Sequence, residues 1–362
     1  MKKLFCILLA VMMLVLAFGC SQTAAPASPE ESAAVKEETA ANAGVAVEGV
    51  SFANNPNLSD GKNVLGICWS NWAAEATQLL IADYEAKYKE YGFDELISIQ
   101  SEGDLETQIS QIQDLANQGV DVMIVNSVDP DGIVPAVEAV QAQGIPVIAV
   151  DRRINTPLYY SFETANYNAG VDICKYVAAK TENLGEVKVL SLPTNLTSIA
   201  VRDRNDGFND EAKYWPHLNV VAEVNLESSI ENCYNAVVDA FKTNPDIKVI
   251  VVSGDNYVAP IASALSDIGK LYPYDDPNHV IVCSYDGAPS ALKYMVNEGV
   301  NDAVANQRFD LFCTEPLKVC QDYLNGIIVE AGQNDIKLET PIVTPKNIQT
   351  LKEMGILWGY NF

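Results

Sequence analysis

The stretch VMIVNSVDPDGIVPAVEAVQAQGIPVIAVD, residues 122–151, decides the fold. It opens on a short apolar run, passes through a polar loop, and continues in a pattern typical of an amphipathic helix. A second apolar run, 145–150, then ends in three charges, Asp151, Arg152 and Arg153. Continuous apolar runs are typical of parallel strands that are covered on both faces. The stretch therefore predicts a strand–helix–strand unit of a parallel sheet.

The same order of events returns further along the chain. The segment VIVVSGDNYVAPIASALSDIG, followed by HVIVCSYD at 279–286, again gives a strand, a polar loop, a helix and a strand that ends in Asp. The two strand–helix–strand units begin at Val122 and Val249, which are 127 residues apart. This weak internal repeat indicates two similar α/β lobes, each with its own sheet.

The rest of the body follows the same alternation of elements. Helical patterns at 76–92 and 105–119 end at Gly92 and Gly119, as helices often end at glycine. We expect strands at 63–69, 96–100, 120–126, 146–151, 186–192, 218–224, 247–253 and 279–286. The predicted fold class is α/β, with two similar Rossmann-like lobes whose parallel sheets are joined by a hinge.

The N-terminus reads as a targeting segment. Lys2 and Lys3 precede an apolar run, 4–18, that is too short for a transmembrane helix of about 20 residues. The run ends in VLAFGCSQ, which is similar to the bacterial lipobox, in which the Cys, here Cys20, becomes the lipidated first residue. We expect a lipoprotein signal peptide at 1–19 and a flexible tether at 20–62, because the tether is rich in Ala, Ser, Pro and Glu and has little apolar surface to bury. An ordinary signal peptide with a chance Cys is the alternative.

Composition excludes several classes of function. The chain has 23 basic and 48 acidic residues, a formal net charge of −25, which disfavours nucleic acid as a partner. Eight Cys and two His occur without a CxxC pair, so no metal site is predicted. Cys68, Cys174 and Cys283 fall in predicted strands and helices and read as small buried hydrophobes. Disulfide pairing among the six Cys beyond Cys20 stays open.

Polar side chains stand where the predicted strands end. Ligands of doubly wound sheets bind at this edge, because loop amides and helix N-termini converge there. The residues in question are Trp69, Ser70, Asn71, Trp72, Ser127, Asp129, Asp151, Arg152, Asp255 and Asp286. Carboxylates and guanidinium groups bind hydroxyls strongly, and indole rings cover the C–H face of a sugar. The set therefore suits a neutral polyhydroxylated ligand. Of the two indoles, Trp72 is the candidate for the site, and Trp69 is the candidate for the core.

An enzyme is the less favoured class. No GxSxG, HExxH, GxxxxGK[ST] or GxGxxG motif follows a strand. Asp151 and Asp286 could form a glycosidase-like pair of carboxyls. However, Arg152 should keep its neighbouring carboxylate ionised, which suits binding better than proton donation. We expect no catalytic residues, no metal and no cofactor.

At this point the body, roughly 63–350, resembles the bacterial type I periplasmic binding proteins of sugar ABC transporters, the ribose- and galactose-binding branch. The resemblance rests on five motifs in order: PVIAVDR, AVRDRNDGF, VIVVSGDNYVAPIASAL, SYDGAPSAL and DAVANQR. It implies that the ligand-binding residues are Asn71, Trp72, Glu75, Asp151, Arg152, Arg204, Asp255, Asn256, Asp286 and Gln307. Two places depart from the family pattern: Gly254 replaces a usual ligand Asn, and the first loop, CWSNWAAEAT, has an unusual sequence.

The resemblance also implies an architecture and a role. The N-terminal lobe should comprise 63–163 and 308–338, and the C-terminal lobe 164–307 and 339–362. The protein should be an exported, membrane-anchored lipoprotein that captures a small polar ligand, a monosaccharide first of all, and delivers it to the membrane subunits of an ABC permease. A nucleoside or a furanose signal is the alternative ligand, and presentation to a chemoreceptor is the alternative role. An export signal and the lack of a basic helix-turn-helix argue against a repressor of related fold.

Overall fold

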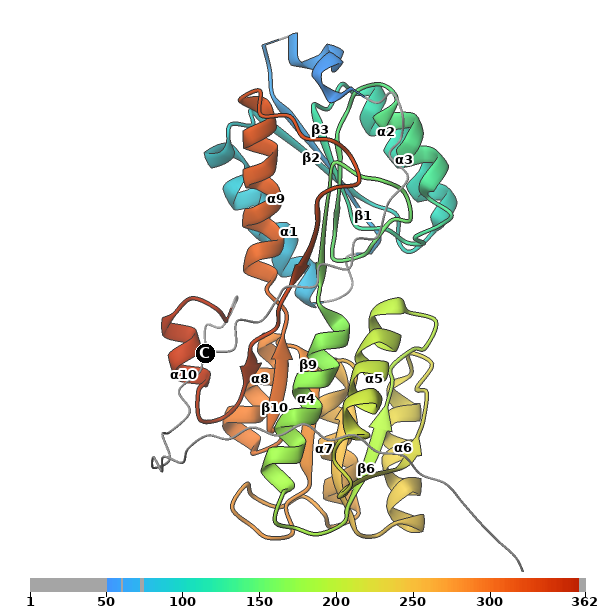
Figure 1. The fold of residues 1–362 in the computed structure, drawn as a ribbon, viewed down its shortest axis with the longest axis vertical. Coiled ribbons are helices and arrows are strands. Elements are labelled where there is room, and N and C mark those ends of the chain that lie inside the picture. The colour runs from blue at the N-terminus through green and yellow to red at the C-terminus, as the bar shows by residue number, and fades with distance from the viewer. Residues whose placement is uncertain (1–50, 60, 72–74, 358–362) are drawn as a thin grey trace, which may run out of the picture. The chain divides into compact units, whose positions relative to one another are not determined.

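Two six-stranded sheets organise the part of the chain that the structure describes (Figure 1). The computed structural model describes residues 51–59, 61–71 and 75–357. These residues lie in one unit, Gly44–Phe362. We call each sheet, with the helices that cover it, a lobe.

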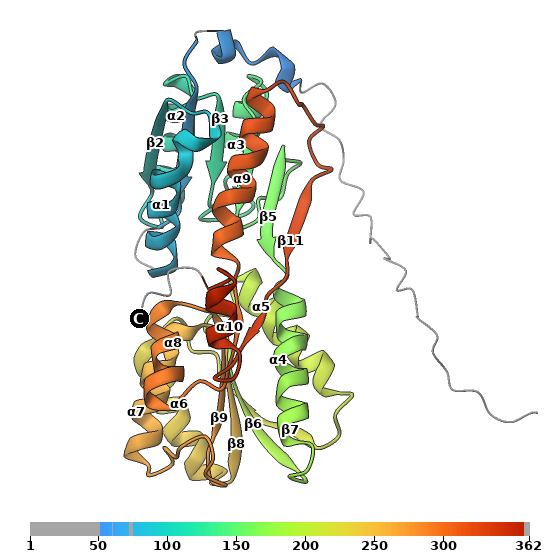
Figure 2. The same cartoon turned by 90° about the vertical axis from the view of Figure 1, so that its left-hand side faces the viewer.

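The sheet of the first lobe is parallel throughout, in the order β11–β5–β4–β3–β1–β2. Figure 2 shows β5 and β11 side by side although they are far apart in sequence. The strands are β1 (Val64–Trp69), β2 (Glu95–Gln100), β3 (Val122–Val125), β4 (Val147–Val150), β5 (Tyr160–Thr164) and β11 (Asp335–Leu338).

The sheet of the second lobe has the order β12–β10–β9–β8–β6–β7, and only the pairing of β12 with β10 is antiparallel among its described strands. The strands are β6 (Val187–Leu192), β7 (Leu218–Glu223), β8 (Ile247–Val252), β9 (Ile281–Asp286), β10 (Ala303–Asn306) and β12 (Ile342–Val343).

All eight strands expected from apolar runs are present, and the predicted α/β fold with two parallel-dominated sheets is confirmed. The expected apolar runs do not include β5, β10, β11 or β12. These strands are short or lie at the edge of a sheet, and two of them carry charged residues, Glu163 in β5 and Lys337 in β11. These segments are strands because they pair with neighbouring strands in the folded sheet, and their local composition does not indicate that pairing.

Helices cover both faces of each sheet, which explains the apolar strands. In the first lobe, α1 (Glu75–Lys87) and α9 (Phe309–Leu324) pack on one face, and α2 (Leu105–Asn117) and α3 (Val134–Gln141) on the other. Trp69 is fully buried under α1, and its indole N–H donates to Ser98 Oγ at 3.0 Å, so it is a core residue as expected.

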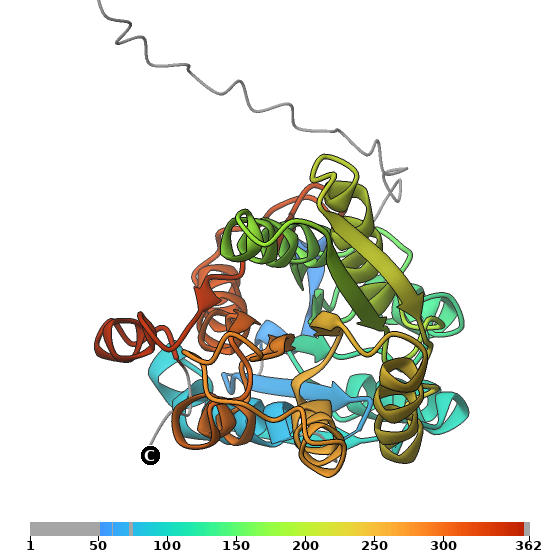
Figure 3. The ribbon, with the colours of Figure 1, turned by 90° about the horizontal axis from the view of Figure 1, so that it is seen from below.

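In the second lobe, α4 (Asn166–Thr181) and α5 (Ile199–Ala212) lie on one side of the sheet. On the other side lie α6 (Ile230–Thr243) and α7 (Val258–Asp267), an arrangement that the end-on view shows (Figure 3). Two shorter helices complete the lobe, α8 (Pro289–Lys293) and α10 (Ile348–Glu353).

Three segments connect the two sheets: β5 to α4, β10 to α9, and β11 to β12. They are bonded to one another. The amide of Ala165 in the first segment donates to the Leu338 carbonyl of the third at 2.9 Å, and the amide of Asn306 in the second donates to the Pro341 carbonyl at 3.0 Å. The crossings therefore form one hydrogen-bonded hinge.

The six cysteines that the structure describes are all buried free thiols. Cys68 and Cys283 lie in β1 and β9, and Cys174 lies in α4. Burial raises the pKa of the Cys68 and Cys174 thiols to about 12. They serve as small apolar core residues, as predicted, because burial disfavours the reactive thiolate.

Two glycines allow α4 and α5 to approach unusually closely. A Cβ on Gly170 would lie 2.1 Å from the carbonyl oxygen of Arg204, and a Cβ on Gly207 would lie 2.1 Å from that of Tyr167. Because both obstacles are backbone atoms, no side-chain movement could relieve the clash. The packing of these helices therefore sets the position of Arg204.

We expect Gly170→Ala to lower the free energy of unfolding by about 1–3 kcal/mol, because the added methyl group overpacks the α4–α5 contact. Urea unfolding followed by circular dichroism measures this loss. Ala179→Ser, at an exposed position of the same helix, is the control and should lie within about 0.5 kcal/mol of the wild type. Equal stability of the Gly170→Ala variant and the wild type would contradict the close packing.

Candidate functional site

A cavity of about 720 Å³ lies between the two lobes, at the carboxyl ends of the strands. Its lining comes from the loops after β3 and β4, the N-terminal end of α5, and the ends of β8, β9 and β10. Six of the residues expected to bind ligand line it together: Asp151, Arg152, Arg204, Asn256, Asp286 and Gln307. The carboxyl ends of the strands in the two repeated units therefore meet at one cavity. This is the edge at which sheets of this kind bind their ligands.

An ion pair between buried Arg204 and half-buried Asp286 lies in the lining of the cavity. Arg204 is 6% exposed, and its Nη1 donates to Asp286 Oδ1 at 2.8 Å and to the Ser253 carbonyl at 2.8 Å. Its Nε donates to Asn166 Oδ1 at 2.8 Å, and its guanidinium lies over the Tyr285 ring at 5.1 Å from the centroid. Four partners fix the guanidinium, so it is preorganised for a ligand.

Gln307 extends this pair toward the hinge. Its Nε2 donates to Asp286 Oδ1 at 2.6 Å, and its Oε1 accepts from Thr164 Oγ1 at 2.5 Å. Its backbone amide also donates to the Asp286 carbonyl at 2.9 Å. In the described residues no donor lies on Asp286 Oδ2, so this oxygen of a cavity-lining residue is available to accept a ligand hydroxyl.

The two repeated strands end in the same strained way. Asp151, directly after β4, has φ 68°, and Asp286, at the end of β9, has φ 102°. Residues other than glycine rarely adopt positive φ, and such strain concentrates at ligand sites. Both carboxylates line the cavity. The repeat therefore carries a backbone geometry as well as a sequence pattern.

Asp151 is half-buried, and its Oδ2 accepts from Asn126 Nδ2 at 3.2 Å. Burial raises the pKa of its carboxyl above its usual value, and the nearby guanidinium groups of Arg152 and Arg204 only oppose that rise. The Arg152 guanidinium lowers the pKa of Asp151, in the direction expected, but the cost of desolvating the carboxylate exceeds this attraction, so the net shift is upward.

The three charges after β4 have different surroundings. Arg152 is exposed and lines the cavity, with Nη1 at 3.4 Å from the Ser127 carbonyl. Arg153 pairs with Glu163 of its own lobe and with Asp203 of the second lobe, each at 3.4 Å. Arg153 therefore links the two lobes, and it also lines the cavity.

Asp255 lies beside the cavity but is not among the residues that line it. Its Oδ2 accepts from the amides of Gly287 and Ala288 at 2.8 and 2.7 Å. The carboxylate therefore holds the turn that follows Asp286, and the expectation of a direct ligand contact is not supported by this geometry. Burial, together with the Asp286 carboxylate, raises the pKa of Asp255 well above its usual range.

The first loop is only partly described. Trp72 lies outside the described residues, as does Cys20. Asn71 is exposed, and neither it nor Glu75 is among the residues that line the cavity. Glu75 instead accepts from Ser290 Oγ of the second lobe at 2.5 Å. It therefore forms a contact between the lobes.

Sequence reasoning missed several residues of the cavity. Asn166 is the first residue of α4, and its signal was the polar Asn that follows the strand-like stretch YSFET. Others come from β5, from the loop after β6, from the stretch LESSIEN at 226–232 and from the loop after β8. They are Glu163, Thr194, Asn195, Thr197, Ser198, Ser228 and Ser253. Asp129, one of the polar residues expected at the strand ends, lines the cavity. It accepts from the amides of Asp131 and Gly132 at 3.0 and 2.7 Å in the turn before α3, whose N-cap is Ile133.

The charges that line the cavity nearly balance. Among the described residues the acids are Asp129, Asp131, Asp151, Glu163 and Asp286, and the bases are Arg152, Arg153, Arg202 and Arg204. No cluster of three or more His, Cys, Asp or Glu that could hold a metal ion occurs in the described chain. Interspersed acceptors and donors of this kind suit a neutral ligand with many hydroxyls.

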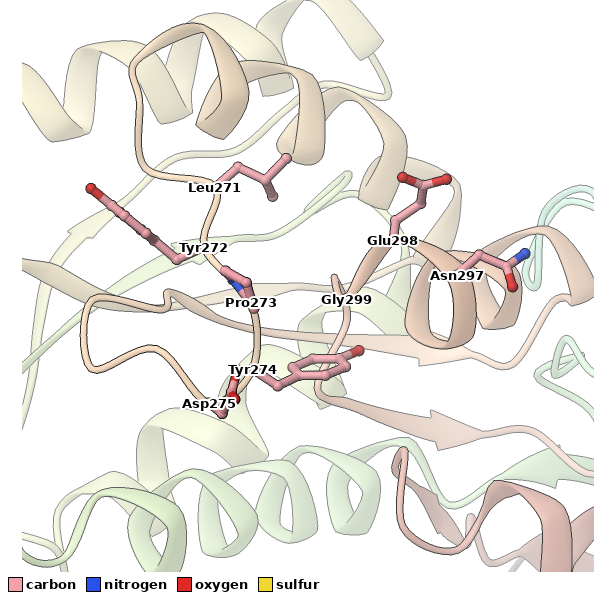
Figure 4. Close-up of a pocket in the computed structure, with 8 residues that line it drawn as sticks. All are labelled: Leu271, Tyr272, Pro273, Tyr274, Asp275, Asn297, Glu298 and Gly299. Carbon is pink, nitrogen blue, oxygen red and sulfur yellow. The ribbon is translucent and has the colours of Figure 1, made fainter.

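A second cavity, of about 470 Å³, lies in the second lobe between the segment before β9 and the end of the short π-helix Tyr294–Glu298 (Figure 4). Its lining residues are Leu271, Tyr272, Pro273, Tyr274, Asp275, Asn297, Glu298 and Gly299. The Tyr274 hydroxyl is bonded to the Met295 carbonyl at 2.8 Å, so it supports the fold. This cavity is at the amino ends of the strands and has no basic side chain among its lining residues, so the first cavity is the candidate site.

The comparisons with known proteins agree with this geometry. A family model described as "Periplasmic binding protein domain" matches residues 67–327. The chain belongs to the periplasmic binding protein family. Among the relatives of this periplasmic binding protein are the ribose import binding proteins of Bacillus subtilis (strain 168) and Escherichia coli (strain K12). They are 26% and 25% identical over 248 and 244 residues, which cover 68% and 67% of this chain and 77% and 79% of theirs.

Solved structures share the fold of this periplasmic binding protein. One is an ABC transporter solute-binding protein from Bacillus halodurans C-125 with bound myo-inositol, with a TM-score of 0.70 and 23% identity over 81% of this chain and 98% of that one. Another, from Actinobacillus succinogenes 130z with bound D-allose, has a TM-score of 0.71 and 18% identity over 80% and 100%. Across the described residues, no helix has the length and apolarity that crossing a membrane requires.

The raised pKa of Asp255 predicts a pH dependence of stability. Because the folded state favours the protonated carboxyl, the contribution of Asp255 is fully present below the unfolded pKa, near 4, and is lost as pH rises through the folded pKa. Asp255→Asn cannot titrate but can still accept from both amides. The variant should therefore gain stability relative to wild type as pH rises from about 4 to 8, by about 1.4 kcal/mol per unit of pKa shift. Urea unfolding across this range tests it, and parallel profiles would contradict it.

Proposed function

We propose that the chain is an extracytoplasmic solute-binding protein that captures a sugar or similar neutral polyol between its lobes and delivers it to an ABC permease. The observation that carries this proposal is the inter-lobe cavity, in which carboxylates alternate with guanidinium groups around the Arg204–Asp286 pair. The names of the ribose-binding relatives support the ligand class. In this role the carboxylates accept hydrogen bonds from ligand hydroxyls.

The residues proposed to bind ligand divide into hydrogen-bond acceptors, donors and amides. Asp151 and Asp286 accept hydroxyl protons, and Arg152 and Arg204 donate to hydroxyl oxygens with a rigid fork of N–H groups. Gln307 and Asn256 supply amides, while Asp255 supports the turn that holds Asp286. From the first loop, Trp72 would supply an indole that covers the apolar face of the ring, whereas Asn71 and Glu75 do not line the cavity.

A panel of ligands tests the ligand class. Residues 21–362 should show a thermal shift with at least one of D-ribose, D-allose, xylitol and myo-inositol. A ligand at 100 times its Kd adds about 2.7 kcal/mol of stability. A shift with adenosine and with no sugar or polyol would replace the sugar proposal with the nucleoside alternative.

Arg152→Ala should abolish the shift, because it removes an exposed donor fork from the cavity while breaking only one long hydrogen bond of 3.4 Å. Lys242→Ala is the control. Lys242 lies on the surface of α6 and pairs only with Asp239 among the described residues, so the shift should be unchanged. Normal binding by the Arg152→Ala variant would show that the site is assigned wrongly.

Membrane anchoring through Cys20 is a further part of the proposal, and it rests on the lipobox-like sequence. We expect the full chain, expressed in a bacterial host, to enter the detergent phase of Triton X-114 and to incorporate labelled palmitate. Cys20→Ala should remove both properties, because the thiol is the site of lipid attachment. Cys6→Ala, within the signal peptide, should change neither. An aqueous, unlabelled wild-type protein would favour the ordinary signal peptide.

A further inference from the structure

Thr164 stands at the hinge and does not line the cavity, yet it is bonded to a residue that does. It ends β5, is 4% exposed, and its hydroxyl donates to Gln307 Oε1 at 2.5 Å. Gln307 directly follows β10, at the start of the second crossing. One side-chain hydrogen bond therefore joins two of the three segments that connect the lobes.

This bond is one side of a closed ring of hydrogen bonds. From Gln307 the ring continues through Nε2 to Asp286 Oδ1 at 2.6 Å, and from there to Arg204 Nη1 at 2.8 Å. Arg204 Nε donates to Asn166 Oδ1 at 2.8 Å, and Asn166 Nδ2 returns to the Thr164 carbonyl at 3.2 Å. Four of the five ring residues line the cavity, and Thr164 is the exception.

The chemistry of the ring fixes how Gln307 is oriented. An ionised Asp286 can only accept, so it requires the NH₂ end of the Gln307 amide. The amide oxygen of Gln307 then points away from Asp286. Because Gln307 is only 7% exposed, this oxygen needs a hydrogen-bond donor from the protein. The Thr164 hydroxyl supplies that donor. Without it the buried oxygen would be unsatisfied, which is costly enough to move the side chain.

We propose that Thr164 is a positioning residue that orients Gln307 and Asp286 for ligand and couples occupancy of the cavity to the hinge. The proposal rests on the proposed function for its ligand-binding part. A ligand hydroxyl that bonds to Asp286 or Arg204 perturbs the ring, and the ring contains atoms of both crossings. Ligand and hinge then share one set of hydrogen bonds. A ligand that bonds to this set more strongly in one arrangement of the lobes shifts the distribution of lobe positions toward that arrangement.

Three variants test the inference. Thr164→Val keeps the shape of the side chain and removes the hydroxyl, and Thr164→Ser keeps the hydroxyl. Thr181→Val is a matched control. Thr181 is buried, like Thr164, but it lies in the second lobe, and its hydroxyl bonds to the Val177 carbonyl and to His217 instead of to the ring. Removing it should lower stability without touching the cavity or the hinge.

The first measurement needs no ligand. Spin labels on Gln113→Cys and Asn235→Cys, exposed sites on α2 and α6, report the distance between lobes by double electron–electron resonance. The other six cysteines of residues 51–357 are buried, so the labels should attach selectively. We expect a broader or shifted distribution for Thr164→Val, and wild-type distributions for Thr164→Ser and Thr181→Val.

The second measurement is affinity, by titration calorimetry with whichever of D-ribose, D-allose, xylitol and myo-inositol binds the wild type. Thr164→Val should weaken binding by about tenfold, the cost of one buried unsatisfied acceptor, and Thr164→Ser should stay within about threefold. An unchanged affinity and distance distribution for Thr164→Val would overturn the inference, as would a Thr164→Ser variant that is equally impaired. If no probe binds the wild type, the proposed function fails, while the distance measurement still decides the role of Thr164 in the hinge.

Discussion

The ion pair of buried Arg204 and half-buried Asp286 is the interaction on which the rest of the site depends. A guanidinium that is 6% exposed is stable only if its N–H groups are satisfied and its charge is matched. The chain meets this need from three directions: the end of β9 supplies the carboxylate, Ser253 supplies a carbonyl, and the start of α4 supplies Asn166. The close contact between α4 and α5, which only glycine permits, sets the position of Arg204. Asp255 holds the turn that follows Asp286.

The two lobes present the same backbone feature to the cavity but surround it with different hydrogen-bond partners. In each, a strand of the repeat ends in an Asp with positive φ that lines the cavity. Asp286 is tied to Arg204 and Gln307, whereas Asp151 accepts from Asn126 and has an exposed Arg152 beside it. The second lobe thus presents the more extensively hydrogen-bonded side of the cavity. For a ligand held between the lobes, such preorganisation lowers the entropic cost of binding.

The site and the hinge are adjacent because of how the crossings pack. The three connecting segments are joined by backbone hydrogen bonds, and Gln307 and Asn166, which lie next to the ends of crossing strands, both line the cavity. Other contacts between the lobes lie further out, where Arg153 meets Asp203 and Glu75 meets Ser290. The partly exposed pair of Arg153 and Asp203 contributes little to stability on its own, since solvent screens it. Hydrogen bonds between backbone groups therefore join the crossings to one another, whereas the side-chain contacts between the lobes are more exposed.

Sequence alone determined the alternation of strands and helices, the repeat, and the polar residues at strand ends, because strand burial and helix periodicity are local patterns. It also placed Asp151, Arg204, Asp286 and Gln307 in one site, through motifs that keep their order along the chain. Only the tertiary structure separated Asp255, which supports a turn, from residues that line the cavity, and only it revealed β5, β11, Asn166 and Thr164 as parts of the hinge and site. These roles depend on which distant backbone atoms lie within hydrogen-bonding distance, and no local pattern of residues encodes that distance.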